Sequence, residues 1–376
     1  MQPSRSPRSL PGCREPTPRP AAGLLICRGM GRVGSAPDER FQPPKPTCAW
    51  CWTNSQRLPV PFICLVFENF RAVTRHLTRP LRAIYDVAAP AKLNLFLHVT
   101  GRRSDGYHLL QSVFMLIDWC DTLHFELRSD GQITREDLTD GEPLQPGDHD
   151  ALPADDLTVR AAKALQKACG TSLGVGIGLN KRIPSQAGMG GGSSDAASCL
   201  LALQRLWGVS LPPAELQNLA LSLGADVPFF LSGGHAWVEG VGEKVTPISL
   251  PHADFVVVKP PTGVSTPDIF SAPALKRDTE TATILDFAAN ANGKKNSITE
   301  FVEFGRNDLQ PVALMMCPQI GQSLDWLAAQ QLRGRMTGSG SAVFAQLPHD
   351  ANLTSAPGGW QVRKCSNLDV HPLAGW

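Results

Sequence analysis

The chain has 376 residues, of which 42% are hydrophobic and 7% aromatic, with a formal net charge of +1. This length supplies enough apolar material for two domains of ordinary size, and the balanced charge excludes a bulk preference for nucleic acid or anionic membranes. No apolar run approaches the ~20 residues that span a bilayer. The ten cysteines are irregularly spaced, which favours reduced thiols in the cytoplasm over a disulfide framework.

Residues 1–82 differ in composition from the rest of the chain. They contain thirteen Lys or Arg, four Asp or Glu and thirteen Pro, which gives this segment a charge of +9 and the remainder −8. Proline at this density interrupts helix and strand patterns and predicts a disordered extension or a misassigned translation start. A targeting peptide is an alternative, and so is a metal site at Cys48 and Cys51, which have the C-x-x-C spacing.

Regular hydrophobic patterning begins near Ile84 and continues toward the C-terminus. The strands that it predicts span residues 85–87, 93–99, 109–116, 122–127, 175–179, 255–259 and 342–347. The second of these places Leu93, Leu95 and Leu97 on one face. The predicted helices span 157–168, 194–207, a short stretch from 213, and 320–330. Residues 129–153 and 260–300 lack a clear pattern and are expected to form loops. Because strands and helices mix without strict βαβ alternation, the sequence predicts an α+β fold.

The strongest local signal is a glycine-rich run that leads into the helix predicted to start near Ser194. Glycine permits positive φ and lets backbone N–H groups approach a ligand, and the free N–H groups at a helix start suit a phosphate. Ser193 or Ser194 is expected to cap this helix or to reach a phosphate or Mg²⁺. No Lys-Ser or Lys-Thr follows the glycines, which excludes a Walker A loop, and no acidic residue is placed to complete a dinucleotide-binding fingerprint. A plain glycine-rich turn is the alternative. The candidate phosphate-binding residues are Pro184, Ser185, Gln186, Ala187, Gly188, Met189, Gly190, Gly191, Gly192, Ser193 and Ser194.

Two other motifs accompany the glycine-rich loop. The first is Ala89-Pro-Ala-Lys-Leu-Asn-Leu95, and the last is Arg335-Met-Thr-Gly-Ser-Gly-Ser-Ala-Val-Phe344. With the glycine-rich loop between them, they resemble the three signature motifs of the GHMP kinases, a family of small-molecule kinases. Three further segments are similar to those of family members whose alcohol substrate carries cytidine diphosphate: Gly101–His108, Gly224–Pro228 and Glu239–Glu243. The resemblance covers residues 84–370.

The resemblance implies a two-domain fold in which ATP and substrate lie in the cleft between an N-terminal domain, 83–245, and a C-terminal domain, 246–376. It implies direct transfer of the γ-phosphoryl group of ATP, taken as its Mg²⁺ complex, to a hydroxyl group. Asp226 matches the catalytic aspartate, which would accept the hydroxyl proton, and Lys92 matches the catalytic lysine beside it. The alternatives are that Asp226 merely caps a turn and that Lys92 extends to solvent. A monomer or weak homodimer without nucleic-acid or membrane partners is expected.

The resemblance also implies a set of substrate-binding residues. Asn94 lies on the same strand face as Lys92 by the period of two, which suits a substrate hydrogen bond. Tyr107 and His108 match a cytidine site, in which the aromatic ring stacks on cytosine and the imidazole bonds its edge. Trp237 matches a second aromatic position on the other face of the base. Ordinary core packing is the alternative for both aromatic residues.

The third motif is either a structural turn or a loop that approaches the phosphates through Thr337, Gly338, Ser339 and Gly340. Ser194 is the candidate protein ligand of Mg²⁺. Lys181 and Arg182, just before the glycine-rich loop, are either nucleotide contacts or a solvated strand end.

Three other functions are compatible with parts of the sequence. A different GHMP kinase would act on another alcohol and would lack the cytosine site. A nucleotide-binding protein without catalysis would not depend on Lys92 or Asp226. Nucleic-acid binding through residues 1–82 would be strongly salt-dependent and lost when this segment is deleted.

Overall fold

The computed structural model describes residues 81–139, 142–143, 152–290, 298–349 and 351–376, all within the unit His76–Trp376. The predictions for residues 1–80, including the cysteine pair, lie outside this part of the chain. Within it, no helix is long and apolar enough to cross a membrane.

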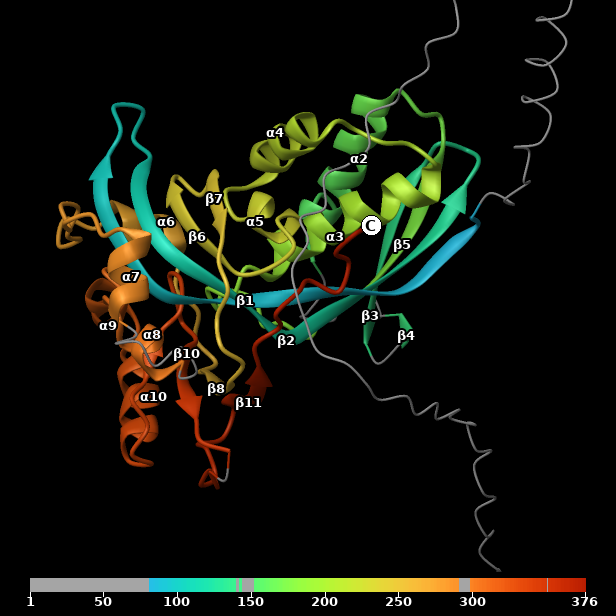
Figure 1. The fold of residues 1–376 in the computed structure, drawn as a ribbon. Coiled ribbons are helices and arrows are strands. Elements are labelled where there is room, and N and C mark those ends of the chain that lie inside the picture. The colour runs from blue at the N-terminus through green and yellow to red at the C-terminus, as the bar shows by residue number, and fades with distance from the viewer. Residues whose placement is uncertain (1–80, 140–141, 144–151, 291–297, 350) are drawn as a thin grey trace, which may run out of the picture. The chain divides into compact units, whose positions relative to one another are not determined.

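Two long antiparallel strands run through the middle of this unit (Figure 1). β1 (Ala83–Arg102) and β2 (His108–Arg128) pair along almost their whole length and are joined by a short turn. The sequence predicted two separate strands in place of each, because polar residues such as Lys92 and Asp118 interrupt the hydrophobic pattern. The structure accommodates these positions within continuous strands, with bulges where the register shifts.

The first sheet has seven strands in the order β4-β3-β5-β2-β6-β7, with β1 paired to β2. Its shorter strands are β3 (Ile133–Thr139), β4 (Glu142–Pro143), β5 (Gly174–Asn180), β6 (Ala236–Gly240) and β7 (Lys244–Pro247). Among the described strands of this sheet, only β3 and β5 pair in parallel. The sequence placed β3 in a loop, and the reason is physical: none of its residues is fully buried, so it leaves no hydrophobic pattern.

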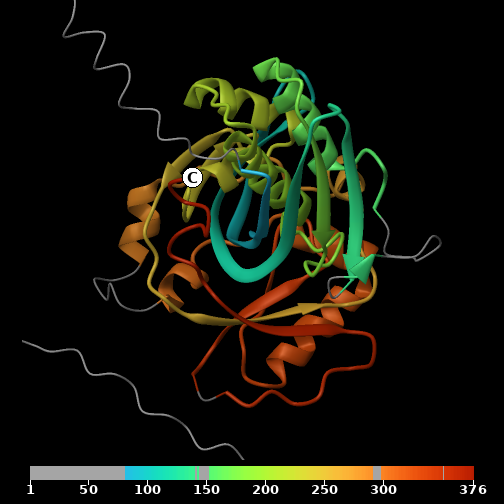
Figure 2. The ribbon, with the colours of Figure 1, turned by 90° about the vertical axis from the view of Figure 1, so that its right-hand side faces the viewer.

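The second sheet has four strands in the order β11-β8-β10-β9. They are β8 (Asp254–Lys259), β9 (Arg335–Met336), β10 (Val343–Leu347) and β11 (Gln361–Ser366). Figures 1 and 2 show this sheet on one side of the β1–β2 pair and the helices of residues 157–231 on the other.

Helices complete the α+β fold class that the sequence predicted. They are α2 (Leu157–Cys169), α3 (Gly191–Trp207), α4 (Pro213–Leu223), α5 (Val227–Leu231), α6 (Thr266–Ser271), α7 (Ile284–Asn290), α8 (Thr299–Glu303), α9 (Gln310–Met316) and α10 (Pro318–Ala328). Helices α6 and α7 fall in the segment expected to be a loop, because helices of six or seven residues are too short to show a clear period.

Apolar side chains form three core clusters, and β1 contributes to each of them. Ala89 belongs to the cluster between the first sheet and α2–α5, and Leu93 and Leu95 belong to an aromatic-rich cluster. Leu97 belongs to the cluster between the second sheet and α9–α10. The three leucines were predicted on one face, but a bulge between Asn94 and Leu97 redirects the last of them. β1 therefore joins the packing of both sheets.

Candidate active site

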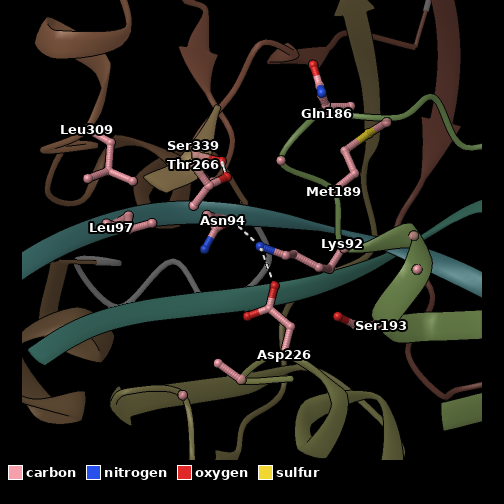
Figure 3. A pocket seen from close by; sticks show the side chains of 18 of the residues that line it. Lys92, Asn94, Leu97, Gln186, Met189, Ser193, Asp226, Thr266, Leu309 and Ser339 are labelled. Carbon is pink, nitrogen blue, oxygen red and sulfur yellow. Dashed lines mark hydrogen bonds and ion pairs between the residues drawn. The ribbon is translucent and has the colours of Figure 1, made fainter. Parts of the chain in front are cut away.

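A cavity of about 1140 Å³ brings together residues that are far apart in the sequence (Figure 3). Its lining comes from the middle of β1, the β1–β2 turn, the glycine-rich loop, the starts of α5 and α6, and the third-motif loop. The candidate site residues that line it are Lys92, Asn94, Tyr107, His108, Lys181, residues 184–193, Asp226, Gly338 and Ser339. Five candidates are not part of this lining: Arg182, Ser194, Trp237, Thr337 and Gly340.

Lys92 and Asp226 meet in this cavity (Figure 3). Nζ of Lys92 lies 3.5 Å from Oδ2 of Asp226 and donates a 2.6 Å hydrogen bond to Oδ1 of Asn94. The ammonium also lies 4.4 Å from the centre of the Phe114 ring, a cation–π distance. Burial lowers the pKa of Lys92, and the carboxylate of Asp226 opposes this shift.

The two residues differ in accessibility. Lys92 is 3% exposed, whereas the side chain of Asp226 keeps 32% of its surface exposed. Lys92 therefore does not extend to solvent, and Asp226 makes no side-chain capping bond although it occupies the N-cap of α5. A buried cation beside an accessible carboxylate can stabilise an anionic group while the carboxylate accepts a proton.

Asn94 holds the Lys92 head group through buried polar contacts. Nδ2 of Asn94 donates to Oγ of Ser112 at 2.9 Å, and the backbone N–H of Asn94 donates to Oγ1 of Thr337 at the same distance. Thr337 was predicted either to approach the phosphates or to belong to a structural turn. It is fully buried, and its hydroxyl accepts the hydrogen bond from the backbone of Asn94 in β1, so its position fits the structural turn.

The glycine-rich loop passes directly over Lys92. The N–H of Lys92 donates to the carbonyl of Met189 at 3.0 Å, and a Cβ on Gly190 would come within 3.3 Å of Cε of Lys92. Gly190 has a φ of 70° and is the N-cap of α3, with no side-chain cap. α3 therefore begins at Gly191, three residues before the predicted start, and its first-turn N–H groups belong to the glycine-rich loop.

This early helix start changes the roles expected of the two serines. Neither Ser193 nor Ser194 caps α3. Ser194 is fully buried, and its hydroxyl has no hydrogen-bond partner in the part of the chain that the structure describes. Ser193 lines the cavity and Ser194 does not, so the assignment of Ser194 as the Mg²⁺ ligand does not hold.

The glycine-rich loop and the third-motif loop interlock through their backbones. A Cβ on Gly188 would lie 2.2 Å from the carbonyl oxygen of Thr337, and one on Gly338 would lie 2.5 Å from that of Gly188. Gly188 and Gly338 also have φ values of 72° and 53°, which favour glycine. Of the third motif, Gly338 and Ser339 reach the cavity, whereas Gly340 does not.

An aromatic and imidazole cluster forms another part of the cavity. Tyr107 is 64% exposed at the β1–β2 turn, and Nε2 of His108 accepts a 3.0 Å hydrogen bond from Nε of Arg277. The His108 ring lies 4.9 Å from that of Phe270 in α6, which also lines the cavity. Burial, together with Arg277 and Arg102, lowers the pKa of His108, so the ring is neutral near pH 7 and carries its proton on Nδ1. Sequence reasoning missed Phe270 and Arg277 because their segment shows no regular pattern.

Trp237 lies away from this cluster. It is 1% exposed and packs with ring centres 5.3 Å from Phe96 and 6.0 Å from Phe287. Alternation along β6 turns the next residue, Val238, toward the cavity instead. A ring enclosed in this way has no face free for a base, so the assignment of Trp237 to the cytidine site is wrong. Phe270 is the aromatic residue that the fold brings to the cavity beside His108.

Lys181 joins a buried charge cluster at the first turn of α3. Its Nζ donates to Oδ2 of Asp195 at 2.7 Å and also to Asp121, and both carboxylates are buried. Burial raises the pKa of Asp195, and Lys181 opposes this shift. Lys181 and Asp195 line the cavity, whereas Arg182 does not, so Lys181 is not a solvated strand end. Isolated acidic residues carry no sequence signal, and Asp121 and Asp195 were therefore not foreseen.

Fold and site place the chain among the GHMP kinases. Residues 156–234 match the GHMP kinases N terminal domain. The crystal structure of the Methanococcus jannaschii mevalonate kinase shares the fold, with a TM-score of 0.54 at 15% identity over 77% of this chain and 99% of that one.

More similar relatives identify the family within the GHMP kinases to which the chain belongs. A 4-diphosphocytidyl-2-C-methyl-D-erythritol kinase from Polaromonas sp. is 75% identical over 79% of this chain and 96% of the relative, and one from Variovorax paradoxus is 59% identical over 79% and 99%. The crystal structure of a 4-(cytidine 5'-diphospho)-2C-methyl-D-erythritol kinase has a TM-score of 0.59 at 33% identity, covering 74% of this chain and 98% of that one. The chain belongs to the family of 4-diphosphocytidyl-2-C-methyl-D-erythritol kinases.

Proposed function

We propose that this chain transfers the γ-phosphoryl group of ATP to the 2-hydroxyl of 4-diphosphocytidyl-2-C-methyl-D-erythritol, giving the 2-phosphate in non-mevalonate isoprenoid precursor biosynthesis. The observation that carries the proposal is the pair of Lys92 and Asp226, 3.5 Å apart, in a cavity that also reaches the glycine-rich loop and Tyr107. The names of the relatives support the substrate. The same proposal has the enzyme act in the cytoplasm as a monomer or weak homodimer.

Asp226 accepts the proton of the 2-hydroxyl group, whose oxygen attacks the γ-phosphorus. A bond forms between that oxygen and phosphorus while the bond from phosphorus to the β,γ-bridging oxygen breaks, and ADP leaves. The ammonium of Lys92 stabilises negative charge on the transferring group, in a buried site where electrostatic interactions are strong. Asn94 holds that ammonium at 2.6 Å, which restricts its position during transfer.

The two substrates bind to different parts of the cavity. The glycine-rich loop and the first turn of α3 bind the ATP phosphates through backbone N–H groups. Tyr107 and Phe270 stack on cytosine, and Nδ1–H of His108 donates to its polar edge. The ligands then lie between the domains 83–245 and 246–376.

Mg²⁺ enters the proposal with ATP and neutralises charge on its phosphates. Among the described residues, no group of three or more His, Cys, Asp or Glu side chains is placed to hold a metal ion. Ser193 and Asp226 offer oxygen atoms in the cavity lining beside the glycine-rich loop. Because Mg²⁺ commonly takes only one or two protein oxygens together with phosphates and water, these residues fit an ion held mainly by the nucleotide.

Release of ADP tests the proposal, with the purified chain, ATP, Mg²⁺ and 4-diphosphocytidyl-2-C-methyl-D-erythritol. We expect turnover that is lost in Asp226→Asn and retained in Asp130→Asn, a control at an exposed turn. Homoserine and mevalonate are assayed in parallel. Turnover of one of these alcohols in place of the cytidyl compound would overturn the substrate, and full activity of Asp226→Asn would overturn the mechanism.

A further inference from the structure

The last ten residues, here called the C-terminal tail (residues 367–376), cross from the second sheet to the first, as the red segment of Figure 1 shows. The N–H of Leu368 donates to the carbonyl of Leu116 at 3.0 Å, and the N–H of His371 donates to the carbonyl of Gly233 at 2.9 Å. Two isolated β-bridges accompany these bonds. The tail is therefore attached by its backbone to β2 of the first sheet and to the segment between α5 and β6.

Each of these segments adjoins an element that carries one member of the catalytic pair. Leu116 of β2 is the ladder partner of Lys92 in β1. Gly233 follows α5, whose N-cap is Asp226. A helix of five residues is not stable on its own, so the orientation of α5 depends on tertiary contacts such as those of the tail.

Buried side chains reinforce the attachment to Leu116 and fix the start of the tail. Nδ1 of His235 accepts a 3.1 Å hydrogen bond from the N–H of Leu116, so Leu116 is held by His235 on one side and by the tail on the other. Oδ1 of Asn367 accepts from the N–H of Ala253 at 2.7 Å, and its Nδ2 donates to the carbonyl of Pro251 at 3.1 Å. Asn367 thereby fixes the point at which the tail leaves the second sheet.

The far end of the tail is anchored in the core. Nδ1 of His371 accepts a 3.1 Å hydrogen bond from the N–H of Leu373, and both residues are almost completely buried. Leu373 belongs to the same core cluster as Phe229 and Phe230 of α5. The turn that His371 closes thus directs the side chain of Leu373 into the core cluster to which α5 contributes.

We propose that the C-terminal tail fixes the separation of Lys92 and Asp226, with Asn367 and His371 as positioning residues. This inference rests on the proposed function of the catalytic pair. The tail, all of whose residues the structure describes, does not line the cavity. Because misplacing a catalytic group by about 1 Å can cost ~10²-fold in rate, loosening the tail acts on the transfer step and leaves substrate binding unchanged.

Variants of the full chain test the proposal. His371→Ala leaves the N–H of Leu373 unpaired, whereas His371→Asn keeps an acceptor there. Asn367→Asp keeps the side-chain volume but replaces the donor opposite Pro251 by an acceptor, and Asn218→Asp on the exposed face of α4 is its matched control. We expect kcat to fall about 10-fold or more in His371→Ala and Asn367→Asp, and both KM values to change less than about twofold. His371→Asn and Asn218→Asp retain the kcat of the unmodified chain.

Unchanged kcat in folded Asn367→Asp and folded His371→Ala would overturn the proposal, and so would a raised KM at unchanged kcat. If His371→Ala does not fold, Asn367→Asp decides the question. A double-mutant cycle that combines Asn367→Asp with Asp226→Asn, measured on the free energy of unfolding, requires no substrate. Non-additive effects are expected, and additive effects contradict the link from the tail to α5. If the unmodified chain does not phosphorylate the cytidyl alcohol, the proposed function fails, and this cycle still decides the role of the tail.

Discussion

At the scale of single residues, the site depends on a buried cation placed against an accessible carboxylate. Replacing Lys92 by Met keeps most of the side-chain volume but removes the charge and the hydrogen bond to Asn94. We expect kcat to fall by ~10²- to 10³-fold. The free energy of unfolding should change little, because the desolvation cost of the ammonium disappears together with its contacts. ADP release measures kcat, and Lys163→Met, at an exposed lysine of α2, is the control. Equal losses in the two variants would contradict a specific role for Lys92.

The aromatic residues give a second prediction at this scale, which distinguishes the role of Phe270 from that of Trp237. Removing a stacking partner of cytosine costs about 1–3 kcal/mol, so Phe270→Ala should raise the KM for the cytidyl alcohol ~10-fold or more. The KM for ATP should stay the same, since the glycine-rich loop, which we propose binds the phosphates, is untouched. Trp237→Phe should leave both KM values unchanged and lower only the free energy of unfolding, because Trp237 is a core residue. Steady-state kinetics of the two variants check this, and a KM effect confined to Trp237→Phe would restore Trp237 to the cytidine site.

At the scale of elements, the glycine-rich loop and the third-motif loop act as one interlocked unit. Gly188→Ala would place a Cβ 2.2 Å from the carbonyl oxygen of Thr337 at a φ of 72°. We expect the free energy of unfolding to fall by about 2 kcal/mol or more, and ATP to bind more weakly, because the loops must separate. Urea unfolding and calorimetry measure the two effects. Gly321→Ala in α10, whose new Cβ would have its nearest neighbour at 3.5 Å, is the control and should be neutral or slightly stabilising. Equal stability of the two variants would show that the loops are not interlocked.

The elements that the sequence predicted well are those whose signal is local. The α2 helix was predicted within one residue, because its apolar positions repeat at the helical period. The motifs around Lys92 and Asp226 are also local, since each is a short run of residues that resembles a family motif, and the structure brings the two side chains together. What could not be predicted depends on distant partners. The long β1 strand tolerates a polar residue such as Asn94 because Ser112 and Thr337, both distant in sequence, form hydrogen bonds with it. Phe270 becomes a lining residue only through the fold.

At the scale of the whole unit that the structure describes, β1 and the C-terminal tail are among the segments that join the sheets. β1 contributes to all three core clusters, and the C-terminal tail runs from β11 to the first sheet. Residues from both proposed domains, 83–245 and 246–376, line the cavity that contains Lys92 and Asp226. Conditions that weaken the attachment of the tail should therefore weaken the fold as well as the site.

Low pH is such a condition, because two histidines at the attachment of the tail, His235 and His371, are buried. Burial lowers the pKa of His235 and of His371 to about 4, from the usual 6.5. Between pH 6.5 and 4 the unfolded chain binds protons that the folded chain does not. The neutral form of these histidines therefore makes its full contribution to the free energy of unfolding above pH 6.5, and this contribution is lost as the pH falls toward 4.

A variant isolates this effect from that of other titrating groups. His371→Asn has no titrating group at the site. As the pH falls from 7.5 to 5, the free energy of unfolding of this variant should therefore rise by roughly 2 kcal/mol relative to that of the unmodified chain. Urea unfolding at the two pH values measures the difference, and His252→Asn, at an exposed histidine, should show no such change. A difference independent of pH would mean that His371 keeps its ordinary pKa in the folded chain. The tail would then be more open to water than its bonds to Gly233 and Leu373 indicate.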